Sequence, residues 1–567
     1  MNNQYKDRDP YSTIKLANLF FLEREILITE QWHDNADINL YSVSIGVGNI
    51  STNGKGVSKL YALASAYGEL MERVQNKAFF YINSNIENMY GEELISDYCV
   101  HSYLEWYKIV SKEYINIFSQ SLFEKFLLSM PSEQKTKVFT SLDGKSTVAL
   151  PNNLLSIIYG SNGMVAGNSE TEAYVQGLSE ILERYVAKIY IEEKQKPIYI
   201  NPESLNFLEN FSFIVDIINK IESTDYFSVK ILDLSMGTDI PAIGIILINK
   251  RDASYFVKIG VHPIMEIAIE RCFTEMFQGR SLIKYSKYMT GASHNKNIFE
   301  SRLNYHNFYV DGRAAFPIEF FWGKEIDYDM KKYNKFKSNK DMKKFLVDLI
   351  YALGYEIFVI NNIVSDIYAF HFLVPGISEV APMDEKTLLN YLEDLNPIEL
   401  LNTKLLHLEK GDVQIIVDYI DNGIDKNMPL DTLIYSHNFL SSSEAKKFYV
   451  LDLYISLNIK LERYDVIVNT IRDSKLLIEN NKTHYNFYYC LKLYCQLKIY
   501  GYQYNYISAV LSNFYKSETL NNLNKYIDNP LCFFNIETCL DNCFSCKKIS
   551  TEGHCQYKLK KELYLIV

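Results

Sequence analysis

Glutamate residues recur at helical spacing in residues 167–185, GNSETEAYVQGLSEILERY. At about 100° per residue, Glu172, Glu180 and Glu183 fall within one sector of roughly 80° on a helix surface. Leu178 and Leu182 belong to an apolar stripe on the opposite side. Three acids on one side of a helix repel one another unless water or a cation separates them. A single copy of this pattern is therefore typical of a solvated acidic surface.

A second copy of the pattern lies upstream, in residues 60–74. It again has two glutamates three positions apart, followed directly by an arginine. The matched residues are Glu69, Glu72 and Arg73 upstream and Glu180, Glu183 and Arg184 downstream. Ser65 precedes Glu69 by four residues and shares its helix face.

A third, weaker copy lies in residues 268–280, where Glu275 and Gln278 take the positions of the two acids. Arg271 precedes Glu275 by one helical turn. One acidic helix is a surface, but three related helices predict a site on which their faces converge. Carboxylates and arginines together are what a phosphate–magnesium cluster needs, because hard oxygen ligands hold Mg²⁺ and guanidinium groups bind the remaining phosphate charge.

The order and spacing of these residues resemble the nucleotide-site motifs of the YcaO family. The motifs are Ser65-x₃-Glu69-x₂-Glu72-Arg73, Glu172-x₇-Glu180-x₂-Glu183-Arg184 and Arg271-x₃-Glu275. The connecting segments TNGKG (52–56), SNGMVAGN (161–168) and VPG (374–376) agree with that family. The resemblance covers about the first 395 residues and continues more loosely behind them.

The resemblance implies an ATP- and Mg²⁺-dependent enzyme that phosphorylates a peptide backbone amide oxygen, so that a nucleophile can attack the amide carbon. Family products include azolines, thioamides and amidines. The implied Mg²⁺ ligands are Glu69, Glu72, Glu172, Glu180 and Glu183, with Glu275 as a further candidate. The implied nucleotide contacts are Lys6, Thr13, Ser65, Arg184 and Arg271. Catalysis would rest on positioning and charge neutralisation, and no catalytic base is named.

The elements that must position these residues form a predicted α+β fold. Residues 39–47 alternate like a half-buried strand and lead into a predicted glycine-rich loop, residues 46–56, which carries Lys55 toward the first acidic helix. This loop lacks the spacing of a P-loop. Residues 136–149 predict a hairpin that turns at Asp143-Gly144. Further strand-like runs between residues 228 and 260 and between 356 and 375 predict antiparallel sheet covered by helices.

The loop before the central helix, residues 161–168, has two interpretations. Gly163 and Gly167 would let the backbone approach a ligand. Alternatively the segment is a plain turn into a helix whose N-cap is Asn168 or Ser169.

Composition predicts a globular protein of two or three domains. The chain has 567 residues, 48% of them hydrophobic and 22% charged. Its net charge of −11 argues against broad nucleic-acid binding, which needs a basic surface. The first residues have no apolar signal region, and apolar runs such as 357–364 are too short to cross a bilayer. We therefore expect a cytoplasmic protein without a membrane segment.

The predicted domains are an ATP-binding domain over residues 1–395, a helical domain over 396–530 and a cysteine-rich tail over 531–567. Beyond residue 397 the apolar residues follow helical spacing, which predicts helical hairpins of tetratricopeptide-like size. Their expected role is packing, a lid or partner binding. Cys490 and Cys495 are expected to be apolar residues of these helices.

The tail combines several cysteines with one histidine within two dozen positions. They are Cys532, Cys539, Cys543, Cys546, His554 and Cys555. In a reducing compartment such a cluster favours a metal over disulfides. The spacing CxxxCxxC occurs in radical-SAM enzymes, but only 21 residues follow Cys546, which excludes a catalytic barrel behind it. Zinc held by Cys539, Cys543, Cys546 and Cys555 is the favoured hypothesis; an iron–sulfur site and free thiols are the alternatives.

Two classes of function remain open. The first is the amide-activating enzyme, acting on a peptide or protein substrate with or without a partner modifying enzyme. The family's azoline-forming members commonly end in a proline-rich tail, whereas this chain has no proline after Pro530. Another branch has been linked to methylthiolation of a ribosomal protein. The second class is a non-catalytic adaptor that presents a partner to another enzyme. A homodimer is implied by the resemblance alone.

Overall fold

The structure is a computed structural model. It describes residues 5–33, 38–47, 50–78, 122, 136–151, 155, 158–205, 212–279, 290–291, 304–305, 308, 314–327, 336–380, 389, 397, 400–401, 405, 408–422, 424, 426, 430, 433, 448–474 and 482–531. These residues divide into two compact units, one within Met1–Leu388 and the other within Leu389–Gln556. Among the described helices, none is both long and apolar enough to cross a membrane.

Side-chain caps fix where the helices of the first unit begin. Asp9 accepts a hydrogen bond from the Ser12 amide and caps α1 (Pro10–Leu22), and Ser58 caps α2 (Lys59–Gln75) in the same way. Ser169 caps the central helix α7 (Glu170–Glu192), which decides between the two predicted caps. The remaining helices of this unit are α8 (Ser212–Glu222), α9 (Met265–Met276) and α13 (Asn339–Ala352).

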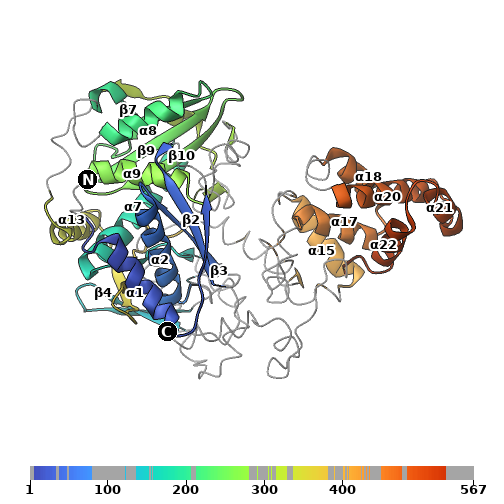
Figure 1. Cartoon of the computed structure of the whole chain (residues 1–567), viewed down its shortest axis with the longest axis horizontal. Coiled ribbons are helices and arrows are strands. Elements are labelled where there is room, and N and C mark those ends of the chain that lie inside the picture. Colours follow the sequence, from blue (N-terminus) through green and yellow to red (C-terminus); the bar gives the residue numbers. More distant parts are fainter. Residues whose placement is uncertain are drawn as a thin grey trace. The chain divides into compact units, whose positions relative to one another are not determined.

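Three sheets form the framework of the first unit (Figure 1). The first has the order β1 (Thr29–His33), β2 (Tyr41–Val47), β3 (Ile50–Gly56). The second has the order β11 (Thr290–Gly291), β10 (Ser254–Val261), β9 (Ala242–Asn249), β8 (Phe227–Asp233), β7 (Ile198–Ile200), β12 (Lys324–Ile326). The third has the order β5 (Thr147–Pro151), β4 (Thr136–Ser141), β13 (Phe358–Asn361), β14 (Tyr368–Leu373), β6 (Met164–Gly167). Every described pairing is antiparallel except that of β7 with β12. The predicted α+β fold with antiparallel sheet and packed helices is confirmed.

Separate hydrophobic cores hold the three acidic helices. The core around α7 includes α13, β14 and side chains from one face of β10. The core around α9 includes α8 and side chains from the opposite face of β8, β9 and β10. The core of α2 joins it to α1 and β2. The edge strand β6 links two of these cores, because Val165 packs with α7 and the next residue, Ala166, packs with α2.

The loop predicted over residues 46–56 is wrong for the described part of this segment, because residues 46–47 end strand β2. Residues 50–56 are strand β3, which pairs with β2 in register from Tyr41–Gly56 to Val47–Ile50. Glycine allows this strand to lie directly against α2, because a Cβ atom on Gly54 would meet the carbonyl oxygen of Ala62 at 2.0 Å. The glycines that suggested a flexible loop therefore serve close packing of a strand on a helix.

The hairpin predicted over residues 136–149 is confirmed as β4 and β5, with Gly144 at φ +72° in the turn. Gly163 and Gly167 lie close to protein atoms. Their Cβ atoms would meet the Phe372 carbonyl oxygen at 2.2 Å and the Ala173 amide nitrogen at 2.7 Å. Both glycines thus allow close packing within the protein.

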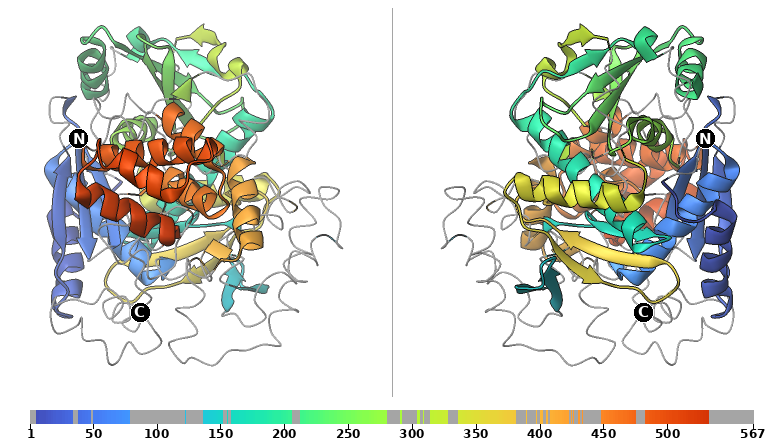
Figure 2. Two further views of the ribbon diagram at one scale, coloured as in Figure 1. Left: turned by 90° about the vertical axis from the view of Figure 1, so that its right-hand side faces the viewer. Right: turned by 90° about the vertical axis from the view of Figure 1, so that its left-hand side faces the viewer.

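The second unit is helical throughout its described elements. They are α15 (Lys410–Asp421), α17 (Val450–Lys460), α18 (Tyr464–Asp473), α20 (Lys482–Ile499), α21 (Tyr504–Leu511) and α22 (Ser517–Asp528). From α15 to α20 each helix contacts the next one named, and α20 also contacts both α21 and α22; Figure 2 shows these helices in orange to red. Cys490 and Cys495 are buried in α20, as expected. The tetratricopeptide-like character of this unit stays a prediction.

Candidate functional site

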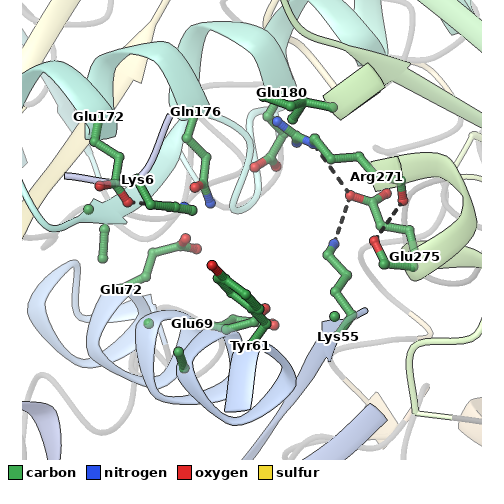
Figure 3. A pocket seen from close by; sticks show the side chains of 18 of the residues that line it. Lys6, Lys55, Tyr61, Glu69, Glu72, Glu172, Gln176, Glu180, Arg271 and Glu275 are labelled. Atoms are coloured by element: carbon green, nitrogen blue, oxygen red, sulfur yellow. Dashed lines mark hydrogen bonds and ion pairs between the residues drawn. The ribbon is translucent and has the colours of Figure 1, made fainter. Parts of the chain in front are cut away.

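A cavity of about 530 Å³ lies between α2, α7, α9, β3, β10 and the N-terminal residues of the chain. Every site residue predicted from the sequence in the first unit lines it. They are Lys6, Thr13, Ser65, Glu69, Glu72, Glu172, Glu180, Glu183, Arg184, Arg271 and Glu275. Figure 3 shows side chains of α7 and of α2 facing each other across the cavity, with Lys55, Arg271 and Glu275 at one end. Cys539, Cys543, Cys546 and Cys555 lie outside the described residues.

The acidic face of the cavity is formed by Glu69 and Glu72 of α2 and Glu180 and Glu183 of α7. On α2, Arg73 lies 3.1 Å from Glu72 and 3.5 Å from Glu69. On α7, a nitrogen of Arg184 lies 2.6 Å from an oxygen of Glu180. The helices α2 and α7 thus bring four carboxylates but only these two arginines to the acidic face. When all four carboxylates are ionised the face keeps an excess of negative charge, even though Arg271 of α9 also approaches Glu183.

Burial makes these charges costly. It raises the pKa of Glu72 well above its usual range, and the neighbouring Glu180 and Glu69 raise it further, while Arg73 only partly offsets them. Burial also raises the pKa of Glu183, followed by the repulsion of Glu275. The nearest cation recorded for Glu183 is Arg271, at 3.7 Å, and its buried Oε2 accepts no hydrogen bond among the described residues. For both carboxylates, the neighbouring cations do not outweigh the effect of burial on the pKa.

The acidic face fits Mg²⁺, provided that a ligand supplies further oxygens. Glu72 and Glu183 are buried, point into the cavity and gain stability from a cation. Among the described residues, however, no group of three or more Asp, Glu, His or Cys side chains could hold a metal by itself. Mg²⁺ in phosphate sites is usually held by one or two carboxylates together with substrate phosphates. The donor set therefore suits a metal–nucleotide complex.

The opposite end of the cavity is cationic. Here the carboxylate of Glu275 lies 2.7 Å from Lys55, 3.8 Å from Lys258 and 4.0 Å from Arg271. Burial alone would raise the pKa of Glu275, but these three cations outweigh burial and lower it far below its usual range. Arg271 is shared with Glu183, from which it lies 3.7 Å, so these cations exceed the nearby carboxylates by at least one positive charge. We call Lys55, Lys258, Arg271 and Glu275 the cationic cluster.

The N-terminal segment closes the cavity beside α7. Lys6 lies 3.0 Å from Glu172, and the backbone amide of Asp7 donates to the other oxygen of Glu172 at 2.9 Å. Thr13 donates to Asn168 at 2.7 Å, and Asn168 in turn donates to Glu172. Glu172 is thus paired already. These contacts give residues 6–13 a defined place beside α7.

The third motif reaches the first through Gln278, which follows the end of α9. Its side-chain amide donates to Glu69 at 3.2 Å and to the backbone carbonyl of Asn53. The weaker copy of the acidic pattern therefore places an amide donor where the other copies place a carboxylate.

Several cavity residues were not predicted from the sequence. Lys258 lies on β10, a strand in which every residue is buried. A single lysine within the apolar run YFVKIG is the sequence feature that could have indicated a functional residue here. Glu270 lines the cavity near Lys6 and Tyr5, and burial raises its pKa to about 7 although both neighbours oppose the shift. His262 and Tyr61 also line the cavity, and no spacing rule singles them out.

Comparison with known proteins identifies the family. A family model described as YcaO cyclodehydratase, ATP- and Mg²⁺-binding, matches residues 53–378. This match spans more than half of the 567 residues, and the chain belongs to the YcaO family.

Two curated relatives and one solved structure illustrate the similarity. The chain is 29% identical over 355 residues to an uncharacterised protein of Haemophilus influenzae, covering 59% of this chain and 58% of the relative. It is 28% identical over 357 residues to the ribosomal protein S12 methylthiotransferase accessory factor YcaO of Escherichia coli, covering 60% and 59%. Less than two thirds of each relative's length is therefore matched. The structure of YcaO from Methanopyrus kandleri, bound with AMPPCP and Mg²⁺, has a TM-score of 0.44 and 16% identity, covering 67% of this chain and 96% of that one.

Proposed function

We propose that this YcaO-family protein binds ATP with Mg²⁺ in the cavity and phosphorylates a peptide backbone amide oxygen. The observation that carries the proposal is the opposed charge of the two ends of one cavity. An acidic face with more carboxylates than cations suits Mg²⁺, and a cationic cluster suits phosphate oxygens that the metal does not neutralise.

Within this proposal the residues have distinct roles. Glu72 and Glu183, assisted by Glu69 and Glu180, would hold Mg²⁺, which when bound neutralises phosphate charge. Arg184 and Arg271 would bind phosphate oxygens, and Ser65 would contact the nucleotide from α2. Lys6 and Thr13 would fix the nucleotide at the edge near α1, with Glu172 holding Lys6 in place.

The proposed reaction proceeds in two steps. The amide oxygen attacks the γ-phosphorus, the bond to the β-phosphate oxygen breaks, and ADP leaves. A nucleophile then attacks the activated amide carbon, and the carbon–oxygen bond breaks to release inorganic phosphate where the oxygen is replaced. The protein contributes alignment and charge neutralisation rather than a covalent intermediate.

The name of one relative suggests a class of substrate. The Escherichia coli relative is called an accessory factor of a ribosomal protein methylthiotransferase. We therefore propose that this chain assists a partner enzyme in modifying a protein, with direct cyclodehydration or thioamidation of a peptide as alternatives. The competing class of function is a non-catalytic adaptor.

The test is ATP binding and turnover with Mg²⁺, comparing wild type with Glu183→Gln and Arg271→Ala. We expect wild type to bind ATP and both variants to lose binding by about tenfold or more, because each removes a charge that faces the cavity. Matched controls are Glu518→Gln and Arg472→Ala, exposed positions in the second unit that should leave binding unchanged. Equal binding by wild type and all variants would contradict the proposed site.

A second measurement separates enzyme from adaptor. An amide-activating enzyme should release ADP above background when a suitable peptide or protein is supplied, and Glu183→Gln should abolish that release. If Mg²⁺–ATP binds tightly but no ADP is released with lysate fractions that contain candidate substrates, the adaptor is favoured.

A further inference from the structure

We infer that Lys55 and Lys258, aligned by Glu275, bind the phosphoryl group while it is transferred, and that Glu275 is a positioning residue rather than a metal ligand. The inference rests on the proposed function and assigns a ligand to the cationic cluster.

The cluster is assembled from three elements that are far apart in sequence. Lys55 comes from β3, Lys258 from β10, and Glu275 with Arg271 from α9. The side chains of Lys55 and Lys258 are 25% and 11% exposed, and both line the cavity. Figure 3 shows Lys55 and Arg271 on either side of the Glu275 carboxylate. A single carboxylate thus determines where three cationic groups point.

The surroundings of Glu275 oppose its use as a Mg²⁺ ligand. Its Oε1 already lies 2.7 Å from Lys55, and its Oε2 lies 3.8 Å from Lys258. A divalent cation at either oxygen would have to displace a lysine or lie beside it, at a Coulomb cost that burial increases. Glu183 has no contact as short as the one between Glu275 and Lys55. Its Oε2 accepts no hydrogen bond among the described residues, and its nearest recorded cation is Arg271 at 3.7 Å.

The chemistry of the ligand follows from the excess charge. The cluster carries more positive charge than Glu275 neutralises, by at least one charge when Arg271 is shared with Glu183, in a largely buried corner of the cavity. A ligand with two or more negative oxygens satisfies it, and in the proposed reaction the γ-phosphoryl group is that ligand. Lysine suits this task because its ammonium group is a compact charge with several donors, which can follow the oxygens as the group moves from ADP to the amide.

The arrangement assigns different parts of the nucleotide to the two ends of the cavity. Metal-bound phosphate oxygens would lie beside the acidic face, and the γ-phosphoryl group would lie beside Lys55 and Lys258. Lys55 and Lys258 should therefore discriminate ATP from ADP, since only ATP carries the γ-phosphoryl group.

The experiment measures the affinities of ATP and ADP by calorimetry at saturating Mg²⁺, for wild type, Lys55→Gln, Lys258→Gln and Lys55→Arg. We expect wild type to bind ATP more tightly than ADP. Each glutamine variant should lose about tenfold in ATP affinity while ADP affinity stays within about twofold, and Lys55→Arg should retain most of the preference. Lys188→Gln, on the last turns of α7 and outside the cavity lining, is the matched control.

A Mg²⁺ titration with Glu275→Gln tests the positioning role. We expect the ATP preference to fall while the Mg²⁺ concentration for half-maximal nucleotide binding stays within about twofold of wild type. A shift of about tenfold in that concentration would make Glu275 a metal ligand and overturn this assignment.

The outcomes separate the inference from the function on which it rests. If wild type binds no Mg²⁺–ATP, the proposed function fails. If wild type prefers ATP and both folded glutamine variants keep that preference, only the inference fails. Thermal melting establishes folding of each variant. If the more buried Lys258→Gln does not fold, the more exposed Lys55→Gln decides the result.

Discussion

The acidic face and the cationic cluster line the same cavity, yet their charges are balanced in opposite ways. At the acidic face, four carboxylates share two arginines, and burial raises the pKa values of Glu72 and Glu183. In the cationic cluster, one carboxylate holds three cations, which lower its pKa despite burial. The two sets of charges are complementary, and Arg271 contacts a carboxylate of each.

The comparison shows that a repeated spacing does not fix a repeated role. Glu69, Glu180 and Glu275 occupy the same position in three related sequence patterns. Each of the three lies near an arginine of its own helix, but only Glu275 also meets lysines from two different strands. The partners brought by the fold, rather than the motif, decide the electrostatic character of each carboxylate.

Gly54→Ala should have the largest effect. It separates β3 from α2, and so moves Lys55 of the cationic cluster away from the acidic face. The new Cβ atom would lie 2.0 Å from the Ala62 carbonyl oxygen and 2.4 Å from the Ala66 amide nitrogen, both backbone atoms. We expect a loss of about 3 kcal/mol in unfolding free energy, measured in urea, with loss of nucleotide binding.

The control for this variant is Gly68→Ala in α2, where an added Cβ meets nothing within 4 Å. Alanine there should be neutral or stabilise by roughly 0.5–1 kcal/mol. Wild-type stability of Gly54→Ala would contradict the close packing described for β3.

Glu183→Gln and Glu275→Gln should change the stability of the ligand-free protein in opposite directions. A carboxyl group whose pKa is raised by folding lowers the free energy of unfolding as the pH rises from about 4.5 through its folded pKa. Over that pH range Glu183→Gln should therefore become more stable relative to wild type. The gain is up to about 1.4 kcal/mol for each pH unit.

Glu275 has the opposite sign because its pKa is lowered on folding. Its stabilisation is present above pH 4.5 and is lost as the pH falls below that value, so Glu275→Gln should be less stable than wild type at neutral pH. Urea unfolding of the three proteins at pH 5, 7 and 8.5 provides the measurement. Shifts of the same sign in both variants would refute the contrast between the two ends of the cavity.

His371, which lies outside the cavity lining, provides a reference for the pH dependence of stability. It is buried in β14, and burial, followed by nearby Lys137, lowers its pKa to about 3. The unfolded chain therefore binds a proton below pH 6.5 that the folded chain does not, and wild-type stability should fall as the solution is acidified.

Replacing His371 by leucine should reduce that loss by about 1.4 kcal/mol at pH 5.5, relative to pH 7.5. A residual slope is expected from His262, whose pKa is also lowered to about 3 by burial. An unchanged pH profile in His371→Leu would show that this histidine does not contribute.

Lys6→Met should have the smallest effect. The ion pair of Lys6 with the buried Glu172 is itself partly exposed, so its loss should cost about 1 kcal/mol or less in unfolding free energy. Lys145→Met, which removes an ion pair with Asp143 at the surface, should cause no measurable change. Equal effects of the two substitutions would mean that the N-terminal segment is not held by this pair.

The acidic helices could be predicted because their signals are local. Caps at Ser58 and Ser169, and apolar residues at helical spacing, define α2 and α7 without reference to distant parts of the chain. The repetition of the pattern then predicted a common site, and the structure brings all three motifs onto one cavity.

The cationic cluster could not be predicted in the same way, because its contacts join distant positions. Lys55 and Glu275 are 220 residues apart, and Lys258 is concealed in an apolar strand. The strand β3 was itself predicted as a loop, since Gly, Ser and Asn are poor strand formers. Its pairing with β2 and its contact with α2 override that local preference.

The sequence positions of the three acidic helices set the order in which the cavity can form during synthesis. α2 ends at Gln75, α7 begins at Glu170, and α9 ends at Met276. On the ribosome, roughly two hundred further residues are therefore made before Lys55 and Glu69 acquire their partners Glu275 and Gln278. At about 5–20 residues per second this takes tens of seconds. Such non-local contacts also slow folding after release. A nucleotide that binds across these helices would thus recognise only chains long enough to include α9, and nucleotide protection of nascent chains would be absent from all shorter ones.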